Sequence, residues 1–157
     1  MPTLRHVNHV IHEPFETWFR PGESSLKSVW VCGEIDIMEF VGFDPNTVHA
    51  NAHCKKYNHI DKTGQSGKLQ VENLTVGFHV FAIEWFPDRI DFYFDDEKYH
   101  TFSNDGTGHD AWPFDRPHYL LLNLAIGGAW GGKEGVDNSI FPQQYLIDYV
   151  RVYQQAE

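Results

Sequence analysis

The sequence predicts an all-β domain, either a sandwich or a barrel. Short runs of alternating apolar and polar residues recur along the chain, as expected for half-buried strands. Turn sequences rich in Pro, Asp, Asn and Gly separate these runs. No segment keeps a helical period of apolar residues over three turns. At 157 residues the chain is long enough for one domain with a hydrophobic core and too short for two ordinary ones.

The alternating runs give the expected strands in order. Besides the strand discussed next, they cover residues 47–53, 78–85, 89–94, 97–102, 118–125 and 145–153. The turns Pro87-Asp88 and Asp95-Asp96 connect three of them into a meander. A Gly-rich loop, residues 127–132, follows one of the later strands and places Trp130 at a rim. We reject phosphate binding for this loop because neither a helix nor a Lys-Ser/Thr pair follows it.

The first predicted strand, residues 33–41, carries the acids that the rest of the chain is organised around. Glu34 and Asp36 are two residues apart, so their side chains share one face of a strand. Ile35 and Ile37 then point into a core. No Lys or Arg lies between residues 31 and 45 to neutralise these acids.

Glu39 is out of step with the other two acids. In a regular strand it would enter the core as an unpaired carboxylate, which is costly. One extra residue at Met38 removes this cost, because a β-bulge returns Glu39 to the face of Glu34 and Asp36 and sends Phe40 to the core. The sequence therefore predicts a bulge at Met38.

The bulge sets the separation of the two Glu carboxyls. The Cα atoms of Glu34 and Glu39 would be about four strand steps apart, or roughly 13 Å, which leaves the carboxyls on the order of 5 Å apart. Retaining glycosidases use a nucleophile and an acid/base about 5 to 5.5 Å apart. A solvated acidic strand face and a divalent-metal site remain alternatives from the residues alone.

Composition narrows the class of partner. The formal charge of −10 argues against nucleic acid and against an anionic membrane, whereas a neutral polysaccharide is compatible. Aromatic residues make up 15% of the chain and offer flat apolar faces on which sugars stack. The sequence has no apolar run of transmembrane length and no signal-like segment near Met1. Cys32 and Cys54 are expected to be free thiols, because strand alternation places them poorly for a disulfide.

The acid-bearing stretch, Glu34-Ile-Asp36-Ile-Met-Glu39, resembles the signature of glycoside hydrolase family 16 in its bulged form. That form is typical of laminarinases (endo-β-1,3-glucanases), agarases and carrageenases. Further segments stand in the family's order and spacing, namely residues 78–88, 112–117, 121–132 and 147–153. The laminarinase branch is the closest likeness.

The resemblance implies a two-sheet antiparallel jelly-roll sandwich of the concanavalin A-like kind. It also implies an extracellular, endo-acting retaining hydrolase of β-1,3-glucan that needs no cofactor. In that reading Glu34 is the nucleophile, Asp36 holds and tunes it, and Glu39 is the acid/base. The alternatives are a glucan-binding module with little or no catalysis, a hydrolase of another polysaccharide such as agar or carrageenan, and a metal-dependent structural sandwich.

Four further residues are expected to contact the sugar chain. His53 should face the cleft beside the acids, and Asn123 lies in one of the matching segments. Trp112 and Trp130 flank Pro or Gly loops, where an exposed aromatic ring serves binding more often than packing. We therefore predict that both Trp rings stack on glucose.

The resemblance begins late in the chain. Residues 1–31 carry no family motif that we recognise, and residues 32–157 correspond to about the C-terminal three-fifths of a catalytic domain. The domain is therefore expected to be N-terminally incomplete. Many family members bind a structural calcium through an Asp at the place of Asp148 and through N-terminal groups. We expect that site to be incomplete here, with Asp148 paired to Arg151.

Overall fold

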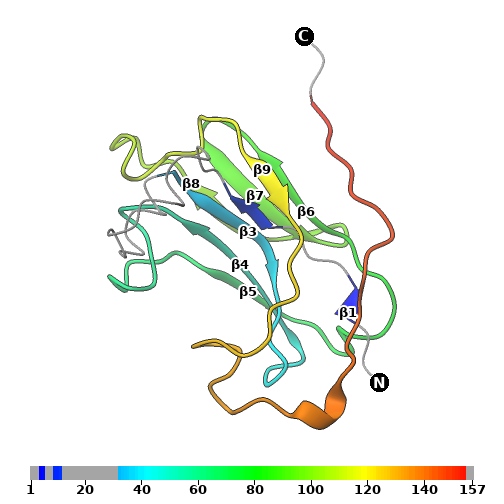
Figure 1. The fold of residues 1–157 in the computed structure, drawn as a ribbon. Coiled ribbons are helices and arrows are strands. Elements are labelled where there is room, and N and C mark those ends of the chain that lie inside the picture. The colour runs from blue at the N-terminus through cyan, green and yellow to red at the C-terminus, as the bar shows by residue number, and fades with distance from the viewer. Residues whose placement is uncertain (1–3, 6–8, 12–31, 155–157) are drawn as a thin grey trace.

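The computed structural model describes residues 4–5, 9–11 and 32–154 (Figure 1). Most of the segment 1–31 lies outside them. The described chain consists of short strands and one 3-10 helix, η2 (Asn138–Ile140). The strands are β1 (Leu4–Arg5), β2 (His9–Ile11), β3 (Glu34–Glu39), β4 (Thr47–His53), β5 (Gly67–Gln70), β6 (Phe81–Trp85), β7 (Arg89–Phe94), β8 (Glu97–Ser103), β9 (Tyr119–Leu121) and β10 (Tyr145–Leu146). Across these residues, no helix has the length and apolar character that crossing a membrane requires.

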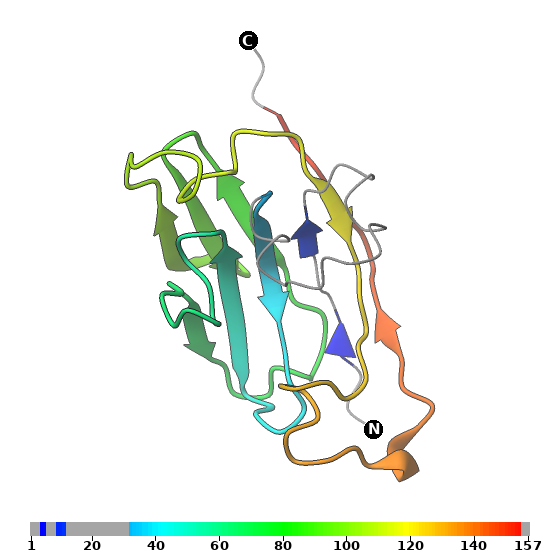
Figure 2. The same ribbon diagram turned by 60° about the vertical axis from the view of Figure 1, so that its left-hand side comes forward.

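Two antiparallel sheets form the fold. The larger has the strand order β5-β4-β3-β2-β9, and the smaller has the order β6-β7-β8. Strand β2 pairs with β3 on one side and with β9 on the other, so a short piece of the N-terminal segment joins β9 to the rest of the larger sheet (Figure 2). A two-residue parallel pair joins β1 to β10. The predicted all-β architecture of two antiparallel sheets is confirmed.

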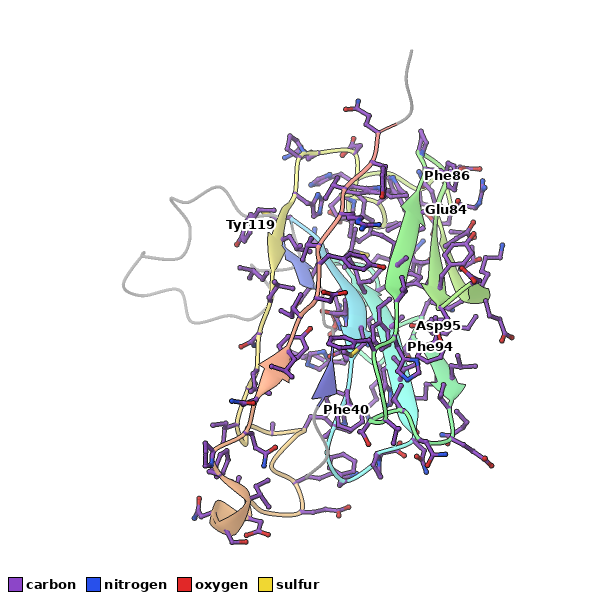
Figure 3. The ribbon with its side chains drawn as sticks, turned by 90° about the vertical axis from the view of Figure 1, so that its right-hand side faces the viewer. Phe40, Glu84, Phe86, Phe94, Asp95 and Tyr119 are labelled. Atoms are coloured by element: carbon purple, nitrogen blue, oxygen red, sulfur yellow. The ribbon has the colours of Figure 1, made fainter. Side chains whose placement is uncertain are left out.

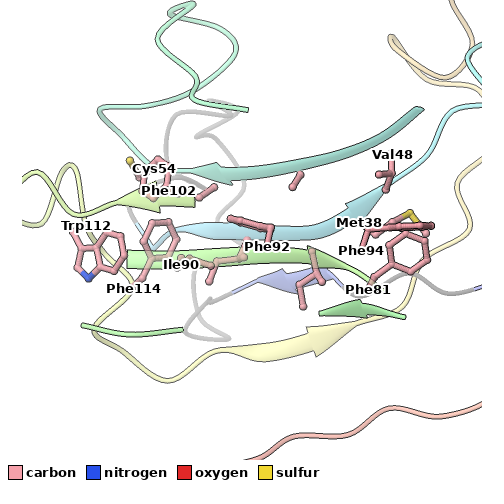
Figure 4. Packing of buried hydrophobic residues seen from close by; sticks show 14 of the residues in the cluster. Met38, Val48, Cys54, Phe81, Ile90, Phe92, Phe94, Phe102, Trp112 and Phe114 are labelled. Atoms are coloured by element: carbon pink, nitrogen blue, oxygen red, sulfur yellow. The ribbon is translucent and has the colours of Figure 1, made fainter. Parts of the chain in front are cut away.

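The hydrophobic core lies between the two sheets (Figure 4). The larger sheet contributes Ile35, Ile37 and Met38 from β3 and Val48, Ala50 and Ala52 from β4. The smaller sheet contributes Phe81, Ile90, Phe92, Phe94 and Phe102. Burying large aromatic side chains of this kind stabilises a domain by about 1.5 to 3 kcal/mol each. The packing fixes the inward face of β3, so the opposite face must carry the acids.

Two predicted strands are much shorter in the structure. The expected strand 118–125 is paired only at Tyr119–Leu121, and the expected strand 145–153 only at Tyr145–Leu146. The chain after each of them is extended but exposed. An alternating sequence can predict a strand, but a strand also needs a neighbouring backbone for its hydrogen bonds, and strand pairing among the described residues ends at Leu121 and Leu146. Figure 3 shows Tyr119 on β9 and Glu84 on β6, the edge strands of the two sheets.

Candidate active site

The bulge predicted in the acid-bearing strand is present. Glu34 lies opposite His53 and Asp36 opposite Asn51, but the next pair is Glu39 with His49. Two residues of β3 therefore face a single residue of β4 between these pairs, which is the definition of a β-bulge. The bulge returns Glu39 to the register of the other acids, as predicted.

The bulge also explains how β3 can be acidic on one face and apolar on the other. Ile37 and Met38 both belong to the buried core, and Met38 is fully buried. Phe40 is partly buried and packs against the same cluster. Two consecutive core residues anchor the strand where it changes register. The core therefore determines the position of Glu39, only one residue further on.

Strand β4 supplies polar partners for the acids. The side-chain amide of Asn51 donates a hydrogen bond to Oε2 of Glu39 over 2.8 Å. The Nε2 atom of His53 lies 3.4 Å from Oδ2 of Asp36, whose side chain is almost fully buried. His53 thus lies beside the acids as expected, while its contact with substrate stays a prediction. The sequence analysis passed over Asn51, although its alternation with His53 places both on the same face.

A glycine positions the start of β3. Gly33 has a φ of +84°, a left-handed conformation that side chains disfavour. A Cβ atom at Gly33 would lie 2.7 Å from both Pro113 Cγ and Phe114 Cε1. The segment that contains these two residues packs directly on the backbone before Glu34. Only glycine allows this close approach.

Trp112 does not line a sugar cleft, so that prediction is wrong. Its side chain is 5% exposed and belongs to the hydrophobic core. Its ring stacks on Phe102 at 5.9 Å between centroids, with planes 13° apart. It also meets Phe114 edge to face at 5.2 Å. A proline follows Trp112, which led us to expect an exposed loop. Instead, Pro113 and Phe114 pack against Gly33, and Trp112 is buried with them.

Trp130 lies in the loop after β9, beside His49 of β4. It is 41% exposed, and its ring meets the ring of His49 at 5.1 Å and that of Phe43 at 6.4 Å, both edge to face. Because His49 is the neighbour of Glu39 across the sheet, Trp130 stands on the Glu39 side of the acids. Asn123 is exposed in the run after β9. The sugar contacts of Trp130 and Asn123 remain predictions.

Cys32 and Cys54 are not joined by a disulfide, as predicted. Cys54 is buried, and its Sγ donates to the backbone oxygen of Ala111 over 3.4 Å. Burial raises the pKa of the Cys54 thiol. Cys32 is partly buried and forms no disulfide with Cys54.

The expected ion pair of Asp148 is absent. Asp148 is exposed, and Arg151 lies over the ring of Tyr149 at 4.2 Å, with no ion pair to Asp148 in the part of the chain that the structure describes. That prediction is wrong, because the extended run gives Arg151 an aromatic neighbour instead. Within the described ranges, no group of three or more His, Cys, Asp or Glu side chains is arranged to hold a metal ion.

Comparison with known proteins gives consistent matches. Residues 23–151 match the family model described as Glycosyl hydrolases family 16. The chain is 49% identical over 147 residues to a protein named Beta-glucanase from Rhodothermus marinus, covering 89% of this chain and 51% of the relative.

Solved structures agree with the sequence matches. The structure of the laminarinase from Rhodothermus marinus superimposes with a TM-score of 0.72 at 38% identity, covering 90% of this chain and 57% of that one. The laminarinase from Flavobacterium sp. UMI-01 superimposes with a TM-score of 0.72 at 32% identity, covering 87% and 54%. The chain thus spans about half the length of each of these three proteins.

Proposed function

Because the chain belongs to family 16 of the glycosyl hydrolases, we propose that it acts as an endo-acting retaining hydrolase of β-1,3-glucan. Membership of this family and likeness to its laminarinases were expected from the sequence and are confirmed by the matches. The jelly-roll fold is confirmed with them. The specific reaction, linkage and substrate are our proposal.

The observation that carries the proposal is the bulged strand with its three acids on one face. Register places Glu34, Asp36 and Glu39 in line on β3, and β4 provides a polar neighbour for each. Acid pairs on one face are what a double displacement at an anomeric carbon requires. A strand that merely presented acids to solvent would not need a bulge or the buried Asp36.

The first half of the reaction forms a glycosyl-enzyme. A carboxylate oxygen of Glu34 bonds to the anomeric carbon while the glycosidic C–O bond breaks. Glu39 gives its proton to the departing oxygen. The Asn51 amide, which donates to Glu39, holds that carboxyl in position. Asp36 orients Glu34 from the same face, and His53 lies beside Asp36.

The second half hydrolyses that intermediate. Glu39, now a carboxylate, takes a proton from water as the water oxygen attacks the anomeric carbon. The ester bond to Glu34 breaks, and both acids return to their starting states. None of these steps needs a metal or an organic cofactor.

The substrate class follows from the relatives and from charge. The relatives include a Beta-glucanase from Rhodothermus marinus and a Glucan endo-1,3-beta-glucosidase A1 from Niallia circulans. A chain with a formal charge of −10 suits a neutral glucan better than a highly sulfated polymer. Because such polymers are too large to enter cells, we propose that the enzyme works outside the cell.

The proposal is tested by Glu34→Gln and Glu39→Gln, with Glu97→Gln as the control. Glu97 is an exposed acid at the start of β8, on the other sheet. Each active-site change should reduce sugar release from laminarin by at least about 10²-fold, the scale of acid–base catalysis. Glucan binding measured by calorimetry should persist, and a chelator should leave the wild-type rate unchanged. A near wild-type rate for Glu39→Gln would refute the assignment.

Stereochemistry and binding separate the alternatives. Proton NMR of the first product should show the β-anomer before mutarotation, since two inversions retain configuration. An α-anomer would refute the retaining mechanism. Glucan binding with no hydrolysis by the wild type would favour a binding module instead, as the name of the Beta-1,3-glucan-binding protein of Penaeus monodon, 28% identical, suggests for that relative.

A further inference from the structure

A cluster of rings lies at the Glu39 end of the site and is not used by the reaction described above. It consists of Phe43, His49 and Trp130, with Lys133 beside it. Phe43 follows β3, His49 lies on β4, and Trp130 and Lys133 belong to the loop after β9. The cluster thus joins three segments that are far apart in the sequence.

His49 belongs to the face that carries the acids. It alternates on β4 with Asn51, which binds Glu39, and with His53, which lies beside Asp36. It stands directly opposite Glu39 in the bulged register. Its side chain is nevertheless 7% exposed. Something other than solvent must therefore cover it, and the ring contact identifies Trp130 as one cover.

The contact between His49 and Trp130 has the geometry of a specific ring pair. The centroids are 5.1 Å apart and the planes are 87° apart, which is the favoured edge-to-face arrangement. Phe43 meets the same indole at 6.4 Å and 85°. Two rings hold the indole, yet it keeps 41% of its surface exposed. A ring that is held on two sides and open elsewhere is suited to stacking on a sugar.

The loop that carries Trp130 is fastened to the same cluster. The Nζ atom of Lys133 lies 3.6 Å from the centroid of Phe43, a cation–π contact. The backbone of Lys133 donates to the oxygen of Trp130 over 3.2 Å, and Gly132 donates to Gly128 over 3.1 Å. Phe43 therefore contacts both ends of this short turn, Lys133 through the cation–π contact and Trp130 through its ring. The contact with His49 then determines the angle of the indole.

His49 has no other evident task in the fold. Its Nε2 atom has no hydrogen-bond partner among the described residues. Burial lowers the pKa of His49, and Lys68, its partner on β5, lowers it further, while Asp44 acts in the opposite direction. The imidazole is therefore neutral at pH 7, the form that packs as a plain aromatic ring.

We propose that His49 is a positioning residue that holds the Trp130 indole, through their edge-to-face contact, as a sugar-stacking wall of the site beside Glu39. The inference rests on the proposed glucanase function, which it deepens by assigning the wall to a ring on β4. It makes the substrate affinity of the site depend on a histidine that touches no sugar.

The test compares His49→Asn with His49→Phe. The first removes the ring, whereas the second keeps an edge for the indole. His49→Asn should raise the KM for laminari-oligosaccharides about 2- to 12-fold, the factor that one edge-to-face contact is worth, with little change in kcat. His49→Phe should restore the KM. His100→Gln, which alters a half-buried histidine on the other sheet, serves as the control and should leave KM unchanged.

A second measurement needs no substrate, so it tests the contact between His49 and Trp130 even if the protein is not a glucanase. Near-ultraviolet circular dichroism of each protein, minus that of the same protein with Trp130→Phe, isolates the indole signal of Trp130. His49→Asn should lose that signal and His49→Phe should keep it. In a Trp130→Ala background, His49→Asn should add no further rise in KM. An unchanged indole signal in His49→Asn, or additive KM effects, would overturn the proposal.

If no variant and no wild-type protein hydrolyses or binds glucan, the proposed function fails. The dichroism signal then still decides whether His49 holds Trp130, so the two failures are distinguishable.

Discussion

Replacing Gly33 by Ala should damage both the stability and the activity of this protein. Gly33 combines a left-handed φ of +84° with a close approach of Pro113 and Phe114. The new methyl group would lie 2.7 Å from an atom of each, well inside van der Waals contact. Phe114 is a buried core residue, so it cannot move out of the way without disturbing its neighbours.

The size of the effect follows from two costs. A left-handed conformation costs a residue with a Cβ about 1 to 2 kcal/mol. Forcing an extra methyl into a packed site costs about 1 to 3 kcal/mol. The free energy of unfolding should therefore fall by about 2 to 5 kcal/mol, a large share of the roughly 5 to 15 kcal/mol of an ordinary domain. The melting temperature should fall by about 2 to 4 °C for each kcal/mol.

Urea unfolding of Gly33→Ala beside Gly42→Ala provides the measurement and its control. Gly42 lies just beyond the other end of β3, and a Cβ there would meet nothing within 4 Å. Gly42→Ala should therefore unfold at the wild-type urea midpoint. Gly33→Ala should also lose sugar release, because relief of the overlap displaces the backbone next to Glu34. Equal midpoints for the two variants would refute the reasoning.

Two further predictions concern stability. Gly67→Ala should lower the free energy of unfolding by about 1 to 3 kcal/mol in urea melts, because the new Cβ would overlap the Cβ and Cγ of His100. In the control Gly64→Ala, the atom nearest to the new Cβ would be 3.7 Å away, so stability should not change. Equal losses of stability in the two variants would contradict this prediction. Burial lowers the pKa of His49 and of His100, so both are neutral in the folded protein at pH 7. The stability that depends on their neutral forms is complete above the unfolded pKa of about 6.5 and is lost as the pH falls. Urea melts at pH 7.5 and 5.5 should show this loss, and His100→Gln should reduce it; an unchanged loss in His100→Gln would argue against this origin.

The position of Glu39 was the most informative part of the sequence, because strand alternation and the cost of burying a carboxylate gave opposite predictions for it. Strand alternation would have buried Glu39, and the cost of an unpaired carboxylate forbade it, so a bulge at Met38 was the solution. Such a conflict is local, and the sequence contains everything needed to resolve it. The partners Asn51 and His53 followed the same local alternation, although only His53 was singled out.

Features that depend on distant segments were predicted less well. Trp112 precedes a proline, which locally favours an exposed loop, but its burial depends on Phe102 and on the approach of its segment to Gly33. The runs 118–125 and 145–153 alternate like strands throughout, but each pairs over only a few residues. Strand length depends on the neighbouring backbone, which no local pattern specifies.

The contacts of β3 explain why so short a segment can carry a site. Its start is fixed where Phe114 packs on Gly33, and its middle is fixed where Ile37 and Met38 enter the core. Its end is fixed by the bond from Asn51 to Glu39. Catalytic groups must be held by residues whose own positions are locked by packing, because small displacements cost large factors in rate.

The two Glu positions are locked by different contacts, Glu34 by the close approach at Gly33 and Glu39 by the bulge and β4. A change at Gly33 should therefore impair the nucleophile first, whereas a change at Asn51 should impair the acid/base first. Azide attacks an anomeric carbon without being deprotonated, so it should speed the Asn51 variant by attacking the glycosyl-enzyme and release a β-glycosyl azide. In the Gly33 variant azide can only attack the substrate directly, and any product should be the α-glycosyl azide; a β-product there would contradict this assignment.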